Sequence, residues 1–495
     1  MRRWGRLAAV VALAALLAAF PAFGRPQAET RPKADVTGWN AFSLPNGLEV
    51  FVLENHQVPL VRVQIAFRCG SVTQEADTAG LFHLYEHMLF KGNRVYASQT
   101  DFQAAMKELG VGSWNGGTGT ESVSYYFTIP SDVLEQGLSF WANAVRYPLF
   151  DAGELATEKD VVANEIRANF SDPDRIYLGA QTKALWSKYP WRKDTSGYEK
   201  AVRSATPEIL ARIRDTWYVP NNAALFVGGD ASPQDVRRAV EKAFGDWKRG
   251  ADPWASPAPS HPFPQRDVRL VYPDEQTYRG LVPVSIQFRG PDVTADPKAT
   301  YAADTWGNFV SDPNGPFRTN LFSKVPGLYR KEYVDAYYVT QRDGGYVQFS
   351  TYLLVRKGED TFQRVLALQK TVESEFAAMA TDPSYFSLRD YDVMKARLAD
   401  ERILERETPD GFIGQLMFWW ATAGTEYYRG YTENLMKTGQ KEIADFLNTY
   451  LIGRKSVLSF RMNPQDLAAE SGNAEKAGFS TISKDDAFWW QEAGR

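Results

Sequence analysis

The sequence has few of the side chains from which several common functional sites are built. It contains one cysteine, Cys69, among 495 residues, so an intrachain disulfide and a cysteine-based metal cluster are both excluded. Neither sign of charge is in large excess, since 56 Lys and Arg residues against 60 Asp and Glu residues leave a net charge of −4. A nucleic acid-binding surface needs concentrated positive charge, so we expect no nucleic acid partner.

The composition is that of a globular chain. Hydrophobic residues make up 44% and charged residues 23%, which provides enough apolar material for packed cores and too little charge for a disordered chain. At roughly 100–200 residues per domain, this length predicts two large domains or about three smaller ones. After residue 24, no apolar run is long enough to span a membrane.

The first 24 residues are typical of a signal peptide. Three arginines within Met1–Arg6 precede fourteen apolar residues, Leu7–Phe20, and Ala22 and Gly24 provide small residues at a cleavage site. This apolar run is shorter than the ~20 residues that a membrane-spanning helix needs. We expect cleavage after Gly24 and an exported, periplasmic mature chain; an uncleaved membrane anchor is the alternative.

The remaining sequence shows a similar order of elements twice. In the first half, period-two and apolar runs predict strands at 41–44, 48–53, 61–67, 122–129 and 223–228, and helical periodicity predicts helices at 80–90, 100–109, 132–146, 154–170 and 233–247. The Asn46-Gly47 pair predicts a hairpin between the first two strands. In the second half, strands are expected at 282–288, 333–340, 346–354 and 456–460, and helices at 361–379 and 387–406.

A proline-rich segment separates the two halves. Residues 250–265 contain five prolines and no periodicity, which indicates a linker. We therefore expect an N-terminal domain at 38–249 and a C-terminal domain at 266–495. The run at 223–227 resembles that at 456–460, which favours an α+β fold made of two homologous domains, each a mixed sheet covered by helices, facing each other as a clamshell. Chance similarity of common residues is the alternative.

Two of the four histidines, His83 and His87, lie four residues apart in a stretch that predicts a helix. Residues at this spacing share one helix face, so both imidazoles could bind one ion. Glu86 lies on the rim of that face, where its carboxylate could accept a proton from a metal-bound water. Two histidines and a carboxylate suit Zn²⁺, and H-x-x-E-H is the zinc motif of the inverzincins. Two histidines hydrogen-bonded in a helix packing face are the alternative.

A catalytic zinc ion needs a third protein ligand and an open position. We expect this ligand from the predicted helix at 154–170, where acidic residues share a face with Val161 and Val162. Carboxylates on such a face need partners, and a divalent cation is a strong one. A solvated charged face with Lys159 and Arg167 alongside is the alternative. The candidate carboxylates are Glu154, Glu158 and Glu165.

The sequence resembles the pitrilysin family of zinc metallopeptidases (family M16, the inverzincins), and within it the bacterial branch similar to mitochondrial processing peptidase. The segments that carry the resemblance are 70–75, 80–92 and 158–166. It covers most of residues 38–250, and the second half mainly through its layout. It implies that His83, His87 and Glu165 bind zinc, that Glu86 is the general base, and that Glu158 supports the ligands.

The resemblance also implies a strand that pairs with the substrate backbone, and Trp114–Thr118 stands in the matching place. Its candidate substrate-binding residues are Asn115, Gly116 and Thr118. The implied activity is zinc-dependent endopeptidase action on short or unfolded peptides. A non-catalytic assembly or substrate-holding subunit of the same fold is the alternative.

The second half departs from the family pattern. Family members that act alone carry an Arg and a Tyr in a stretch resembling L-R-x-x-x-G-L-x-Y. The corresponding stretch here is 321–330, in which Lys324 lies near the arginine position and Tyr329 comes earlier than the tyrosine position. Lysine lacks the planar guanidinium fork. We therefore expect the zinc-bearing subunit of a two-chain peptidase, with the Arg/Tyr pair on a paralogous subunit or a second copy. Arg318 or Arg330, together with Tyr329 or Tyr333, could instead replace the pair.

Overall fold

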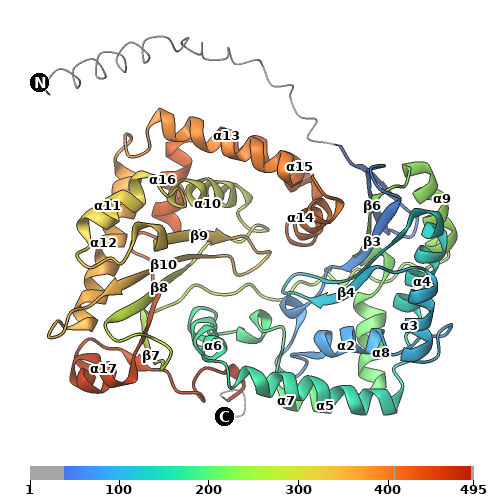
Figure 1. The fold of residues 1–495 in the computed structure, drawn as a ribbon, viewed down its shortest axis with the longest axis horizontal. Coiled ribbons are helices and arrows are strands. Elements are labelled where there is room, and N and C mark those ends of the chain that lie inside the picture. The colour runs from blue at the N-terminus through green and yellow to red at the C-terminus, as the bar shows by residue number, and fades with distance from the viewer. Residues whose placement is uncertain (1–37, 406, 492–495) are drawn as a thin grey trace, which may run out of the picture. The chain divides into compact units, whose positions relative to one another are not determined.

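The computed structural model describes residues 38–405 and 407–491, which form two six-stranded mixed β-sheets with helices packed on them (Figure 1). The predicted signal peptide lies outside the described residues. Among the described residues, no helix is both long and apolar enough to cross a membrane.

The first sheet has the strand order β1-β2-β6-β3-β5-β4. β2 and β6 are parallel, and the other neighbours are antiparallel. The Asn46-Gly47 hairpin joins β1 to β2, as predicted. β4 is an end strand that pairs only with β5 in this order, which leaves its other edge free of sheet pairing. The strands are β1 (Asn40–Ser43), β2 (Glu49–Glu54), β3 (Leu60–Phe67), β4 (Ser113–Thr118), β5 (Val123–Pro130) and β6 (Ala223–Gly229).

The second sheet repeats this topology. Its order is β12-β7-β11-β8-β10-β9, so β7, β11, β8, β10 and β9 take the places of β2, β6, β3, β5 and β4, with the same single parallel pair among them. The sequence similarity between 223–227 and 456–460 falls on the equivalent strands β6 and β11. The two-domain α+β fold is therefore confirmed. These strands are β7 (Val268–Pro273), β8 (Leu281–Arg289), β9 (Asp335–Val339), β10 (Tyr346–Leu354), β11 (Ser456–Met462) and β12 (Ser480–Thr481).

The helices predicted from periodicity in the first half are present as α2, α3, α4, α5 and α9, but several further helices were not predicted. The helices before β7 are α2 (Leu81–Leu89), α3 (Gln99–Glu108), α4 (Leu134–Arg146), α5 (Ala152–Asn169), α6 (Pro173–Leu185), α7 (Glu199–Ser204), α8 (Pro207–Trp217) and α9 (Pro233–Phe244). The later helices are α10 (Pro297–Val310), α11 (Pro316–Lys324), α12 (Thr361–Thr381), α13 (Leu388–Leu404), α14 (Pro409–Thr422), α15 (Thr425–Lys437), α16 (Gln440–Tyr450), α17 (Pro464–Ala469) and α18 (Ser471–Lys476).

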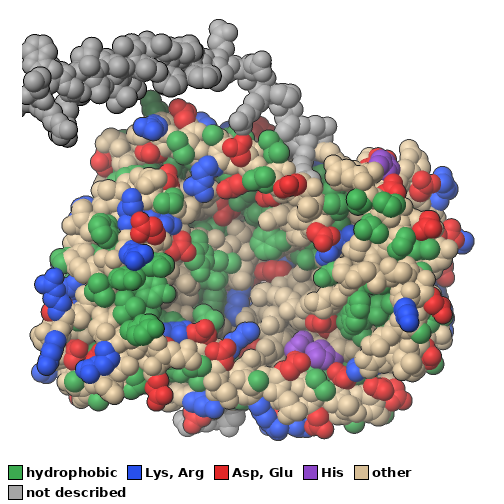
Figure 2. All heavy atoms as spheres, in the orientation of Figure 1, with side chains coloured by type: hydrophobic (Ala, Val, Ile, Leu, Met, Phe, Trp, Pro, Cys, Tyr) green, Lys and Arg blue, Asp and Glu red, His purple; other side chains and the backbone are tan. Residues whose placement is uncertain are grey.

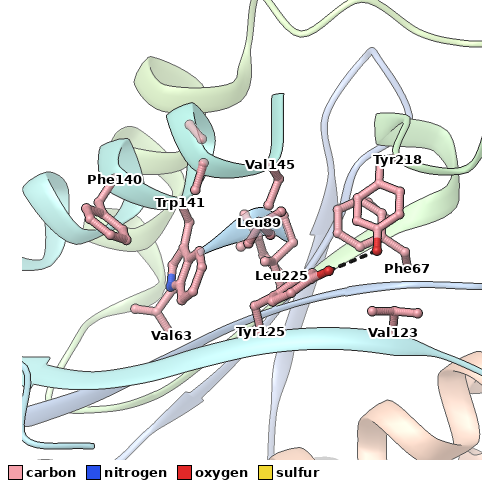
Figure 3. Packing of buried hydrophobic residues seen from close by; sticks show 14 of the residues in the cluster. Val63, Phe67, Leu89, Val123, Tyr125, Phe140, Trp141, Val145, Tyr218 and Leu225 are labelled. Atoms are coloured by element: carbon pink, nitrogen blue, oxygen red, sulfur yellow. Dashed lines mark hydrogen bonds between the residues drawn. The ribbon is translucent and has the colours of Figure 1, made fainter. Parts of the chain in front are cut away.

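One face of the first sheet packs against helices of the same half. Figure 3 shows Trp141 of α4 lying on this sheet. The Trp141 ring is 5.0 Å from that of Phe127 on β5. In the same cluster, the hydroxyl groups of Tyr125 and Tyr218 are hydrogen-bonded at 2.9 Å. This packing extends to α2, whose apolar residues belong to the same buried cluster.

Each half also places a helix on the sheet of the other half. α14 contacts β3 and β6, and its Trp420 packs against Phe226 at a ring distance of 5.8 Å. In return, α6 contacts β8 and β11, where the Tyr177 hydroxyl group is 2.9 Å from that of Ser459. The two sheets are thus joined by reciprocal contacts.

The proline-rich segment at 250–265 forms neither helix nor strand, and it is anchored to its surroundings. Arg192 donates a hydrogen bond to the carbonyl oxygen of Pro259 at 2.6 Å, and the backbone N–H of His261 donates to Asp343 at 2.9 Å. The domain boundaries on either side of this segment stay predictions.

Candidate metal centre

α2 carries the histidine pair, and its start is determined by a glycine. Gly80 has φ of 94°, a conformation that favours glycine, and a Cβ atom there would lie 2.6 Å from the carbonyl oxygen of Ser196. Its N–H donates to Gln74 Oε1 at 2.7 Å. α2 buries Leu81, Phe82, Leu84, Tyr85, Met88 and Leu89, so its more exposed face is left to His83, Glu86 and His87.

The two imidazoles face a common point. His83 Nε2 and His87 Nε2 are 3.3 Å apart, and the rings are nearly perpendicular, at 89°. Two nitrogens bound tetrahedrally to one zinc ion at the usual bond length lie about 3.3–3.4 Å apart. The separation therefore fits two ligands of one ion. Figure 2 shows histidine side chains at the surface in the region where Figure 1 places α2.

α5 packs against α2 and brings a carboxylate to this point. Glu165 Oε2 lies 3.7 Å from His83 Nε2 and 3.8 Å from His87 Nε2. The three donor atoms lie within 4.8 Å of one another, and in the described part of the chain this is the group able to hold a metal ion. The donor set of two imidazoles and one carboxylate fits zinc. Of the three glutamates considered on α5, Glu154 does not join the group.

Glu158 lies one step further from the proposed ion. The Nδ1–H group of His87 donates to Glu158 Oε2 at 2.9 Å, and Lys91 Nζ lies 2.5 Å from the other carboxylate oxygen. These hydrogen bonds, first from His87 and then from Lys91, lower the pKa of Glu158. A proton held on Nδ1 leaves the Nε2 lone pair of His87 free for a metal ion.

The surroundings act differently on the two imidazoles. Burial, together with the neighbouring His87, lowers the pKa of His83 to about 4, so this ring is neutral at pH 7. For His87, burial alone would lower the pKa, but the hydrogen bond with Glu158 and the charges of Glu165 and Glu86 outweigh burial and raise it. A proton therefore competes with a metal ion more strongly at His87 than at His83.

Glu86 occupies a confined position beside the histidines. Its Oε2 accepts a hydrogen bond from the Thr118 hydroxyl group at 2.8 Å. A Cβ atom at Gly116 would lie 2.9 Å from Glu86 Oε1 and 2.9 Å from Phe90, so only glycine leaves room for this carboxylate. Burial raises the pKa of Glu86, although the Thr118 hydrogen bond acts against it.

The predicted substrate-binding residues lie on β4, the end strand of the first sheet. Thr118 and Gly116 approach Glu86, as described, while Asn115 is exposed and lies opposite Tyr126 of β5 in the strand register. Their role in substrate binding stays a prediction. Trp114 next to them is also exposed and lies 5.0 Å from the Phe90 ring.

The candidate replacements for the Arg/Tyr pair have different surroundings. Lys324 Nζ lies 2.5 Å from the buried Glu375 of α12, and Arg318 donates to the carbonyl oxygens of Val310 and Glu332. Tyr329 and Tyr333 are exposed, with stacked rings 5.7 Å apart. Arg330 lies over the Tyr329 ring at 5.4 Å.

Sequence reasoning assigned no role to Lys91, Gln99 or Gln74, which support this site. Gln99 accepts a hydrogen bond from Lys91, and Gln74 holds the start of α2. The sequence does contain a signal for Lys91, which is its position shortly after the helix that bears the histidine pair. A lysine at such a position can reach an acid on a neighbouring helix.

The fold and the donor set define a two-domain α+β protein with a His-His-Glu group on two helices that could hold a metal ion. Residues 50–197 match the family model described as insulinase (peptidase family M16), and residues 204–321 match the model described as the peptidase M16 inactive domain. The two matches together cover more than half of the sequence. The chain belongs to peptidase family M16, and the resemblance seen in the sequence is confirmed.

Relatives of known sequence support this assignment. An uncharacterized zinc protease of Rickettsia felis is 26% identical over 212 residues, which are 43% of this chain and 51% of that protein. The chain spans about half, or less, of the length of the curated relatives that it matches.

Two solved structures have a similar fold. A protease from Helicobacter pylori has a TM-score of 0.71 at 18% identity, covering 86% of this chain and 99% of that one. The first half of the periplasmic protease PqqL from Escherichia coli has a TM-score of 0.69 at 16% identity, covering 88% of this chain and 93% of that one.

If His83, His87 and Glu165 bind one ion, the variant Glu165→Gln should bind zinc roughly 100-fold or more weakly than the wild type, because loss of a direct ligand exceeds the 10–100-fold effect of losing a ligand's partner. Competition with a chelator would measure the affinity, and elemental analysis should find close to one zinc ion per wild-type chain. Glu154→Gln, on the same helix, is the matched control. Equal affinities of the two variants would contradict the ligand assignment.

Proposed function

We propose that this chain is a zinc-dependent endopeptidase that cleaves short or unfolded peptides. The observation that carries the proposal is the convergence of His83 Nε2, His87 Nε2 and Glu165 Oε2 on one point, with the Glu86 carboxylate close enough to interact with His87 and Glu165. A zinc ion at this point would polarise the scissile carbonyl group and lower the pKa of a bound water toward ~7. The chain's own residues would supply the proton transfers and the position of the peptide.

Glu86 is the proposed general base. Thr118 donates a hydrogen bond to Glu86 Oε2, and we propose Oε1, which lacks this contact, as the oxygen that takes a proton from the attacking water. The raised pKa of this buried carboxyl group favours the step, because a base works best when its pKa lies near the operating pH. The same carboxyl group would then pass the proton to the leaving amine.

β4 is the proposed binding strand for the substrate. Gly116 and Thr118, which approach Glu86, both belong to β4. The strand with the free edge is therefore also the strand that contacts the proposed base. An extended peptide could add to this edge through backbone hydrogen bonds, which recognise any sequence. Only an unfolded or short segment can present its backbone in this way, which supports the proposed substrate class.

We further propose that the chain is the zinc-bearing subunit of a two-chain peptidase, as a heterodimer or a homodimer. Lys324, near the expected arginine position, forms an ion pair with the buried Glu375, and a lysine lacks the planar guanidinium group of the expected arginine. The whole PqqL structure is similar to this chain over 49% of its own length, with a TM-score of 0.68, so this chain corresponds to about half of that protein. In the proposed arrangement, a second subunit would supply the other half.

Replacing the proposed base by Glu86→Gln should reduce peptide hydrolysis by at least ~100-fold, because general base catalysis contributes about 10²–10⁴-fold to rate. Zinc content should stay at the wild-type level, since Glu86 is not among the three proposed ligands. Cleavage of an internally quenched unfolded peptide would report the rate, and elemental analysis would report the metal.

The same assay distinguishes the subunit arrangements. The wild-type chain alone should cleave the peptide weakly or not at all, and addition of a paralogous subunit should raise the rate in the wild type but not in Glu86→Gln. Strong cleavage by the chain alone as a monomer would contradict the two-chain arrangement. A zinc-bound wild type that stays inactive with every partner would instead favour the substrate-holding role.

A methyl group at position 116 tests the space around the base. Gly116→Ala should lower the hydrolysis rate at least tenfold without loss of zinc, because its Cβ would lie 2.9 Å from Glu86 Oε1 and displace that oxygen. Gly117→Ala is the matched control, since a Cβ there meets no atom within 4 Å. Similar rates for the two variants would show that Glu86 does not need its observed position.

We also propose that the chain is exported with Met1–Gly24 as a cleaved signal peptide, because these residues have the charge and length pattern of such a segment. N-terminal sequencing of the mature protein should start at Arg25. A mature chain that starts at Met1 and stays with the membrane would favour the anchor.

A further inference from the structure

Lys91 is a nearly buried cation that the proposed reaction does not use. Its side chain is 15% exposed, and its ammonium group lies 2.5 Å from Glu158 Oε1. The same group donates a hydrogen bond to Gln99 Oε1 on α3 at 2.9 Å. Lys91 therefore joins the segment after α2 to both α3 and α5.

The local backbone holds Lys91 in this place. α2 ends at Leu89, and Gly92 turns the chain with φ of 131°, where a Cβ atom would lie 3.0 Å from the backbone of Ala97. On the other side, the Phe90 ring packs against Phe102 of α3 at 5.9 Å. Because both neighbours are constrained, the side chain of Lys91 leaves the backbone from a defined point.

Glu158 transmits this constraint to a proposed metal ligand. The carboxylate is 6% exposed, and its two oxygens have different partners, Lys91 on Oε1 and His87 Nδ1 on Oε2. Rotation of the carboxylate would break one contact or both. The chain of contacts from Gln99 through Lys91 and Glu158 thus ends on the imidazole whose Nε2 faces the ion position.

Charge balance favours the same role. Glu86, Glu158 and Glu165 bring three carboxylates around the two imidazoles, and Lys91 is the cation that the structure pairs with one of them. Without that cation, Glu158 would keep a nearly buried oxygen with no partner, which is costly. It could then turn toward the ion itself and compete with Glu165.

We propose that Lys91 is a positioning residue of the metal centre, which holds Glu158 in the one orientation that directs His87 Nε2 toward the ion. The inference rests on the proposed function, because it takes the ion at this point to be zinc. It adds a residue that acts through two others and touches neither the ion nor the peptide.

The test measures zinc affinity by competition with a chelator, with melting temperature as a check on folding. Lys91→Met should weaken zinc binding by roughly 10–100-fold, the usual effect of losing a partner of a metal ligand. Lys91→Arg, which keeps a cation able to reach Glu158, should restore most of the affinity. Lys107→Met, an exposed lysine on α3, is the matched control and should bind zinc like the wild type.

A double-mutant cycle distinguishes positioning from general stabilisation. Glu158→Gln removes the carboxylate through which Lys91 is proposed to act, so adding Lys91→Met to it should weaken zinc binding little further. If the losses of zinc affinity caused by the two substitutions multiply, the two residues act independently and the inference is overturned. The inference is also overturned if Lys91→Met binds zinc as tightly as Lys107→Met. If Lys91→Met does not fold, Gln99→Ala takes its place, because it removes the other contact of the Lys91 ammonium group. Gln99→Ala should weaken zinc binding less than Lys91→Met would, and it should cause no further weakening when it is combined with Glu158→Gln.

Failure of the positioning role and failure of the proposed function give different results in these experiments. A wild-type chain that binds no zinc would overturn the proposed function. A wild type that binds zinc and cleaves peptides, with zinc affinity unchanged in Lys91→Met, would overturn the positioning role alone.

Discussion

The packing of α5 against α2 is the constraint on which the site depends. α2 by itself brings two imidazoles to one side of a helix, and two ligands do not make a catalytic metal site. Glu165 is 78 residues beyond His87 in the sequence, yet its Oε2 lies 3.8 Å from that imidazole. Both helices belong to the buried cluster on the first sheet, so the core of the N-terminal half sets the ligand geometry.

Glu158 makes the same packing more specific. Its position seven residues before Glu165 puts it on the same side of α5, where it meets the far nitrogen of His87 and the Lys91 ammonium group. One helix thus provides both a proposed ligand and the group that sets the tautomer of another ligand. A small rotation of α5 would disturb both functions together.

Much of this organisation could be predicted from the sequence, and the misses have physical causes. Strands and helices with strong periodicity were found, and the β6/β11 similarity pointed to the duplication. Helices α6, α8, α10 and α14 were not predicted from apolar periodicity. Each begins with a proline directly after an Asp or Thr cap, a pattern that marks helix starts without periodicity.

What the sequence alone determined follows from local geometry. The spacing of His83, Glu86 and His87 sets their positions on one helix, because a helix has a regular repeat. The family resemblance already singled out Glu165, but its approach to the two histidines, the narrow space at Gly116 and the contact of Lys91 with Glu158 were decided by tertiary structure. Each depends on the distance between elements that are remote in the sequence, and that distance is set by how side chains fill the core between them.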